Sequence, residues 1–220
     1  MTDLRILHKD HHLLVVNKPG GLLTVPGRLP ENKDSILTRL LKDYPNSQIV
    51  HRLDMPTSGL LLVPQSKAAL SHLARQFQSR TIGKRYLAVV TGLLNPNEGE
   101  VDVPLICDWP NRPRQMVAAN GKPSLTHYRV LARDEAQQCT LVRLMPVTGR
   151  SHQLRVHMTH IGHPIVGDTL YGAPLTLPAA RLYLHAEQIS FTHPVTGCEM
   201  NFTHEGFSWP LNRNDLTKSQ

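Results

Sequence analysis

Short apolar runs that end at proline or glycine constrain the fold of this chain more than any other feature. Leu13-Leu14-Val15-Val16 is followed by Lys18-Pro19-Gly20-Gly21, and Gly59-Leu60-Leu61-Leu62-Val63 is followed by Pro64. Runs of this length, closed by turn residues, are typical of strands buried in a sheet. No apolar stretch reaches the ~18 residues that a membrane-spanning helix needs, so a soluble protein is predicted.

The rest of the chain mixes helical and extended patterns. Helices are predicted over 35–41, from the cap Ser66 to Phe77, and from the cap Ser151 to Ile161. Strands are predicted over 85–90, 126–131 and 140–145, with two more between 182 and 202, whereas 94–122 suits loops and short strands. Strands both follow one another and alternate with helices. The predicted class is therefore α+β, with a mixed, mainly antiparallel central sheet flanked by helices and loops.

The composition indicates which class of partner the protein binds and in which cellular compartment it works. Lys and Arg outnumber Asp and Glu by 24 to 17, so the net charge of +7 makes a polyanion such as nucleic acid the first partner to consider. Cys107, Cys139 and Cys198 form no C-x-x-C pair, which argues against a disulfide framework and suits a reducing compartment. With no signal peptide, a cytoplasmic protein is predicted, as a single domain over 1–212 with a polar tail at 213–220.

The most unusual local string is His51-Arg52-Leu53-Asp54-Met55-Pro56-Thr57-Ser58-Gly59, directly before an apolar strand. It places one acid and two potential cations, His51 and Arg52, in a loop at the edge of a sheet, where active-site groups commonly lie. An Asp beside Arg is expected to be ionised. Taken alone, the string equally suits a salt bridge within an ordinary loop.

A second basic cluster spans residues 148–157, Thr-Gly-Arg-Ser-His-Gln-Leu-Arg-Val-His. If Ser151 opens the helix, unpaired N–H groups and partial positive charge collect at that end. Arg150 and His152 lie at the same end, which suits a phosphate, and Arg155 is about one turn further on. A surface amphipathic helix with solvated basic residues is the alternative.

The third string, Lys84-Arg85-Tyr86-Leu87-Ala88-Val89, puts a tyrosine between cations on a strand. Tyr86 suits stacking against a base, although a cross-strand tyrosine in the core is the alternative. The 13 histidines include His152, His157, His160 and His163, but no H-E-x-x-H string or thiolate partner accompanies them, so no metal site is predicted. Neither a P-loop nor a G-x-G-x-x-G string is present, so no nucleotide cofactor is predicted.

Together, and in this order, the three strings resemble the RluA family of pseudouridine synthases. H-R-L-D-x-x-T-S-G, K-x-Y and G-R-x-H-Q-L-R carry the resemblance, which runs from about Leu13 to Ala186. The string at 107–113, Cys-Asp-Trp-Pro-Asn-Arg-Pro, resembles more narrowly the member that modifies both large-subunit (23S) ribosomal RNA and tRNA. Many relatives carry an N-terminal RNA-binding module, for which the sequence before Leu13 leaves no room.

The resemblance implies an isomerase that detaches uracil from its ribose and rejoins it through C5. Asp54 matches the catalytic aspartate of the family, Tyr86 its active-site tyrosine, and Arg155 the arginine paired with that aspartate. Arg52 matches the arginine that fills the stack when the target base flips out. His51, Lys84, Arg150 and His152 are predicted to bind the RNA around this site.

This chemistry makes further demands. An isomerisation needs no redox cofactor, nucleotide or metal, so no cofactor is predicted, and a monomer is adequate for it. Because the glycosidic bond is inaccessible in paired RNA, the uridine must leave the stack at a cost of a few kcal/mol, which favours stem-loop substrates. Three alternatives stay open: a tRNA-only synthase, a catalytically silent RNA-binding or RNA-folding protein, and a metal-dependent nuclease.

Overall fold

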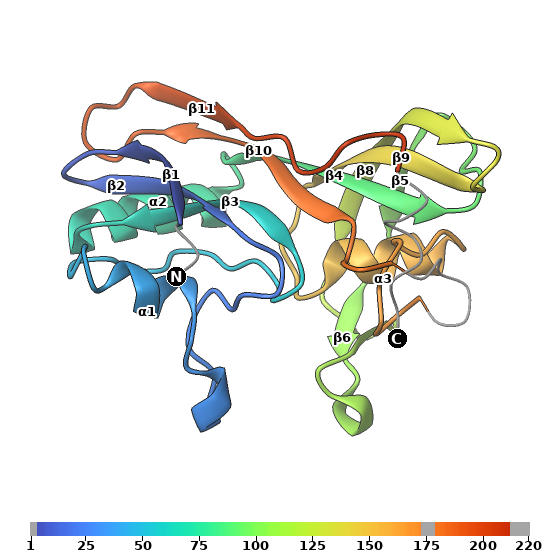
Figure 1. Ribbon diagram of the computed structural model, residues 1–220, viewed down its shortest axis with the longest axis horizontal. Coiled ribbons are helices and arrows are strands. Elements are labelled where there is room, and N and C mark those ends of the chain that lie inside the picture. The colour runs from blue at the N-terminus through green and yellow to red at the C-terminus, as the bar shows by residue number, and fades with distance from the viewer. Residues whose placement is uncertain (1–3, 173–178, 212–220) are drawn as a thin grey trace. The chain divides into compact units, whose positions relative to one another are not determined.

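The computed structural model describes residues 4–172 and 179–211, which divide into two compact units (Figure 1). The first unit comprises residues 1–84 and 186–206, and the second comprises 85–185 and 207–220. The chain passes from one unit into the other three times: within β4 (Gly83–Thr91), within β10 (Leu184–Thr192), and between Gly206 and Phe207. Each unit has its own apolar core.

The first unit is built on the strand order β1-β2-β3-β10, with β11 paired to β10. Its further strands are β1 (Arg5–Lys9), β2 (Leu13–Lys18), β3 (Ser58–Pro64) and β11 (Glu199–Thr203), and its helices are η1 (Pro30–Asn32), α1 (Ile36–Leu40) and α2 (Lys67–Ser79). The antiparallel register places Lys18, the last residue of β2, opposite Gly59 in β3. Apolar side chains of β2, β3 and α2 share one buried cluster.

The apolar runs of this unit fold as predicted. Leu13–Val16 lie within β2 and Gly59–Val63 within β3, and all of these side chains are buried. Ser66 caps α2, because its hydroxyl accepts a hydrogen bond from the amide of Ala69 at 3.2 Å. Ser35 caps α1, which is shorter than predicted and ends at Leu40. Strand β1 was not predicted from the pattern.

The second unit contains the strand order β4-β9-β8-β5 and a separate two-stranded sheet of β6 and β7. Its elements are β5 (Glu98–Asp102), β6 (Leu105–Cys107), η2 (Trp109–Asn111), β7 (Gln115–Val117), β8 (Leu125–Asp134), β9 (Cys139–Pro146) and α3 (Gln153–His160). The predicted hairpin is formed by β8 and β9. Alternate residues of β4, including Ala88 and Val90, pack with Leu154 and Met158 of α3 in one core.

The fold class is α+β, with a mixed, mainly antiparallel sheet and few helices, as predicted. The strand pairs β1–β2, β2–β3, β4–β9, β5–β8, β6–β7, β8–β9 and β10–β11 are antiparallel, and a parallel bridge joins Leu23 to Ser35. The three cysteines, all in described segments, are free thiols. Within 4–172 and 179–211, no helix is long and apolar enough to cross a membrane. The predicted tail at 213–220 lies outside the described residues.

Candidate functional site

In the first unit, the loop before β3 carries Arg52 and Asp54. Arg52 is exposed and Asp54 is half-buried, whereas Leu53 between them is buried. The amide of Thr57 donates to the carbonyl oxygen of Asp54 at 3.1 Å and closes a tight turn. The loop therefore presents a carboxylate and a guanidinium just before a fully buried strand.

A buried lysine anchors this loop from the end of β2. The Lys18 side chain is 0% exposed, and its Nζ donates to the carbonyl oxygens of Pro19, Leu22 and Met55 at 2.9, 2.7 and 2.9 Å. Three protons of an ammonium group thus meet three carbonyl oxygens, which compensates for the burial of the charge. Because Met55 directly follows Asp54, the ammonium fixes the backbone on the C-terminal side of the carboxylate.

The N-terminal side of Asp54 is fixed by a hydroxyl. Oγ1 of Thr24 donates to the carbonyl oxygen of Leu53 at 2.9 Å and accepts from the Leu53 amide at 3.2 Å. The amide of Gly21 donates to the carbonyl oxygen of Met55 at 2.9 Å. Both neighbours of Asp54 are therefore clamped to the segment after β2, and this clamp restricts where the carboxylate can point.

His51 and Lys84 are more buried than their predicted RNA-binding role implies. Nε2 of His51 accepts a hydrogen bond from the amide of Leu62 at 2.9 Å, and its ring lies 4.7 Å from that of Phe77. Burial, with a smaller contribution from Lys84, lowers the pKa of His51 to about 3. Burial, together with Arg80, lowers the pKa of Lys84. His51 is therefore neutral near pH 7 and holds β3, rather than supplying a positive charge.

In the second unit, Tyr86 lies on β4 opposite Leu144 of β9. It is half-buried and packs against the cluster that includes Ala88 and Leu154 of α3. Because side chains alternate along a strand, the exposed Arg85 points to the other face of the sheet. The tyrosine thus stands on the side of the sheet that α3 covers.

Arg155 of α3 forms a buried ion pair with Asp168. Nε and Nη2 of Arg155 donate to the two carboxylate oxygens at 2.7 and 2.8 Å, and the side chains are 3% and 0% exposed. A two-pronged geometry of this kind is the strongest form of a guanidinium–carboxylate contact. Asp168 therefore occupies one edge of the guanidinium and fixes its orientation.

The turn that follows α3 holds Asp168 itself in place. Its Oδ1 also accepts from the amides of Leu170 and Tyr171 at 2.9 and 3.1 Å. Gly167 before it has a φ of +77°, and a Cβ there would collide with the carbonyl oxygen of Arg181. A glycine is required at this position, and the glycine–aspartate pair is the local signal that marks the turn.

Tyr171 links Arg155 to His152. The Cζ atom of Arg155 lies 5.1 Å from the centre of the Tyr171 ring, and the Tyr171 hydroxyl lies 2.5 Å from Nδ1 of His152. His152 has a φ of +55°, a left-handed conformation that is uncommon outside glycine. The backbone turn and the tyrosine together direct the imidazole toward the start of α3.

The predicted helix cap at Ser151 is wrong. Helix α3 begins at Gln153, with His152 as its N-cap residue and no side-chain cap. The Gln153 side chain ties the first turn of α3 to the preceding loop, because its Oε1 accepts from the Arg150 amide at 3.0 Å and from the Thr148 hydroxyl at 2.8 Å. The half-buried Arg150 donates through Nε to the carbonyl oxygen of Pro123 at 3.2 Å.

The histidines considered as metal ligands have separate environments. Nδ1 of His163 lies 2.8 Å from the carbonyl oxygen of Thr91, and burial lowers the pKa of His157 to about 4. Among the residues that the structure describes, no three His, Cys, Asp or Glu side chains come together in a way that could hold a metal ion.

The predicted residues therefore occur in two groups. Arg52 and Asp54 share a clamped loop in the first unit, while Arg150, His152 and Arg155 gather around the start of α3 in the second. Sequence patterns missed the residues that hold them: Lys18, Thr24, Asp168 and Tyr171. Lys18 was recognised only as part of a turn signal, and the Gly167-Asp168 pair was the available signal for the other turn.

Comparison with known proteins decides the family. The family profile described as RNA pseudouridylate synthase matches residues 12–160. The dual-specificity RNA pseudouridine synthase RluA of Yersinia pestis is 54% identical over 202 residues, which is 91% of this chain and 98% of that protein. The chain belongs to the RluA family of pseudouridine synthases.

Further relatives agree with this placement. The RluA protein of Escherichia coli K12, of the same description, is 54% identical over 90% of this chain and 91% of its own length. Among solved structures, human RNA pseudouridylate synthase domain containing 1 superposes with a TM-score of 0.79 at 30% identity, covering 93% of this chain and 84% of that one. As a member of the RluA family, the chain is an RNA pseudouridine synthase, an isomerase that converts uridine to pseudouridine.

Proposed function

We propose that this synthase modifies uridines in stem-loops of both tRNA and large-subunit (23S) ribosomal RNA, with Asp54 as its catalytic carboxylate. The two substrates are inferred from the dual specificity named for relatives that match almost the whole chain. The role of Asp54 is supported by the clamp on its neighbours Leu53 and Met55, which orders a half-buried carboxylate in an otherwise irregular loop.

The reaction assigns a role to each residue. The target uridine leaves its stack, and the exposed Arg52 offers a planar guanidinium to occupy the vacated space. The Asp54 carboxylate attacks or stabilises C1′ of the ribose as the bond to N1 of uracil breaks. The detached uracil turns, and C5 bonds to C1′ as any bond between Asp54 and C1′ breaks. The C5 proton is released, and N1 takes up a proton. Substrate and product contain the same atoms at the same oxidation level, so the reaction needs no co-reactant.

The second unit supplies the remaining groups. Tyr86 is half-buried on β4, with an aromatic ring suited to stacking on uracil. Arg155, held by Asp168, is a permanent cation and is proposed to keep the catalytic carboxylate ionised. Lys84 of the first unit, together with Arg150 and His152 of the second, is proposed to contact the RNA around the site. We further propose that the enzyme acts as a monomer in the cytoplasm without a cofactor.

Tritium release tests this proposal directly. Unmodified tRNA and 23S rRNA transcripts labelled at uridine C5 are incubated separately with wild-type protein and with Asp54→Asn, in EDTA. We expect release from both RNAs with wild type and none with Asp54→Asn, whose affinity for RNA should stay nearly unchanged. Release from tRNA alone would identify a tRNA-only synthase. Binding without any release would identify an RNA-binding protein, and a large loss of affinity in Asp54→Asn would contradict its role.

A further inference from the structure

The β6–β7 hairpin is the part of the second unit that the reaction above leaves without a role. It spans Leu105 to Val117, with η2 at its tip, and it projects away from the β4-β9-β8-β5 sheet (Figure 1). The tip is tightly folded: the Asn111 side-chain amide donates to both carboxylate oxygens of Asp108 at 3.0 and 3.1 Å. The amide of Arg114 donates to the Asn111 carbonyl oxygen at 3.0 Å, which closes the turn.

This ordered tip holds an indole out in solvent. Trp109 is 64% exposed, and the Cζ atom of Arg112 lies 3.5 Å from the centre of its ring. Large apolar side chains contribute to stability mainly when they are buried, so folding alone gives little reason for a tryptophan here. Arg112 and Arg114 are also exposed and make the surroundings of the indole positive. The Asp108 carboxylate, by contrast, accepts hydrogen bonds from the Asn111 side chain.

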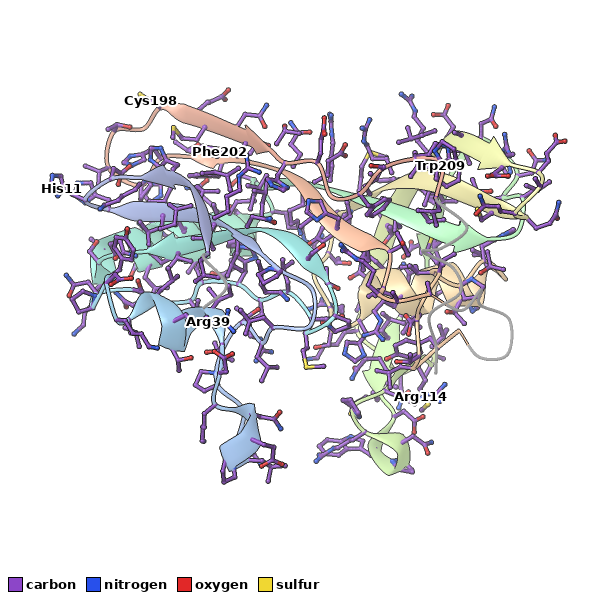
Figure 2. The ribbon with its side chains drawn as sticks, viewed as in Figure 1. His11, Arg39, Arg114, Cys198, Phe202 and Trp209 are labelled. Atoms are coloured by element: carbon purple, nitrogen blue, oxygen red, sulfur yellow. The ribbon has the colours of Figure 1, made fainter. Side chains whose placement is uncertain are left out.

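The base of the hairpin is joined to the residues around Arg155. The amide of Gln115 donates to the Tyr171 hydroxyl at 2.8 Å, and the Cζ atom of Arg114 lies 5.5 Å from the Tyr171 ring centre (Figure 2 labels Arg114). Leu105 packs with Tyr171 and Val156 of α3 in one small apolar cluster. Tyr171 therefore contacts both the hairpin and Arg155, so the tip is rigidly connected to the candidate site in this unit.

We propose that the hairpin tip is a stacking platform for an unpaired nucleotide of the RNA substrate. Trp109 supplies the aromatic face, Arg112 completes the platform, and Arg112 and Arg114 attract the flanking phosphates. An aromatic face stacks on any base that is outside a duplex, which makes the contact selective for loops and not for sequence. The proposal rests on the proposed function and adds to it a residue that selects unpaired RNA.

Tryptophan fluorescence gives a direct test, because the chain has two tryptophans, Trp109 and Trp209. Trp209→Phe leaves Trp109 as the single reporter, and Asp54→Asn in the same protein prevents turnover. The protein is titrated with whichever of the two transcripts releases more tritium, and in parallel with a fully paired RNA duplex. We expect saturable quenching with the transcript and little with the duplex. No quenching, or equal quenching by both RNAs, would overturn the proposal.

Affinity separates stacking from a structural role. In the Asp54→Asn background, Trp109→Ala should weaken transcript binding about tenfold, whereas Trp109→Phe should keep most of the affinity. Val195→Ala removes another exposed apolar side chain, 56% exposed and in the first unit, and should leave binding unchanged. With Asp54 intact, Trp109→Ala should raise KM and leave kcat at saturating RNA nearly unchanged.

Each contrary result has a distinct meaning. Unchanged RNA affinity in Trp109→Ala would overturn the proposal that the hairpin tip is a stacking platform. A loss confined to kcat would also overturn it, because the hairpin would then act by supporting Arg155. Equal losses in Trp109→Ala and Val195→Ala would point to a general effect on folding and would also contradict it. Failure of the proposed function is seen separately, as no tritium release from the wild-type protein.

Discussion

Arg155 is held by partners that lie after it in the chain. Asp168 binds one edge of the guanidinium, and Tyr171 packs against it. The pair is almost fully removed from water, so the two charges help to compensate for each other's burial. The orientation of Arg155 is therefore a property of the turn after α3 as much as of α3 itself.

Asp168→Asn should expose this dependence. Removing one charge of this buried pair breaks its two-pronged contact, and breaking a buried pair typically costs about 3–5 kcal/mol of the free energy of unfolding. We also expect kcat to fall about tenfold or more with a smaller change in KM, because a misplaced group affects the reacting atoms more than RNA binding. Urea unfolding and steady-state tritium release measure the two effects.

A surface ion pair in the same unit provides the control. Nη2 of Arg129 lies 3.1 Å from Oε2 of Glu98, but both side chains are largely exposed. Glu98→Gln should lower the free energy of unfolding by less than about 1 kcal/mol. If Asp168→Asn costs no more than Glu98→Gln, the buried pair does not have the structural importance argued here.

At the residue scale, sequence patterns predicted the enzyme class and candidate site residues, but not the residues that hold those candidates in place. The three strings located Arg52, Asp54, Tyr86 and Arg155 because they are local in the chain. The burial of Lys18 depends on how β2 pairs with β3, and that pairing is not visible in a turn signal. His51 was interpreted as a cation for the same reason, because its burial comes from neighbours distant in sequence.

At the scale of elements, strands and the Ser66 cap were predictable because their signals are local. Strand β1 has only two apolar residues and is largely half-exposed, so it gives no comparable signal. The start of α3 was misplaced because His152, in a left-handed conformation, occupies the N-cap position, and no side chain caps the helix. A serine is a common cap, but the backbone turn at His152 shifts the start of the helix past Ser151.

Gly59 at the start of β3 shows why the motif ends in glycine. Its φ is +121°, and a Cβ at this position would collide with the backbone of Ala186 in β10. Gly59→Ala should therefore lower the free energy of unfolding by more than about 2 kcal/mol, since backbone strain and overpacking add. Thermal or urea unfolding of the whole chain measures this loss.

Gly197 in the same unit offers a matched comparison. It also has a positive φ, +73°, but a Cβ there would meet nothing within 4 Å. Gly197→Ala should show only the conformational cost, about 1 kcal/mol. The difference between the two variants measures the close approach of β3 to β10 together with the greater backbone strain of an alanine at a φ of +121°. Equal losses would show that neither of these limits the substitution at Gly59.

At the scale of the whole molecule, both units contain a histidine whose pKa is strongly lowered. Burial lowers the pKa of His51 to about 3 in the first unit and that of His157 to about 4 in the second. An unfolded histidine titrates near 6.5, so below that pH the unfolded chain binds more protons than the folded one. Stability is therefore complete above about pH 6.5 and declines as the pH falls toward the folded values.

Each of these histidines should contribute a slope of about 1.4 kcal/mol per pH unit between pH 6 and pH 4.5. His51→Gln keeps an acceptor for the Leu62 amide but cannot titrate, so it should remove about that slope. Urea unfolding at closely spaced pH values measures it, with His157→Gln as the counterpart in the second unit and the exposed His11→Gln as the control. An unchanged slope in His51→Gln would show that this ring accepts a proton without unfolding, and it would remove the argument that His51 is a neutral support for β3.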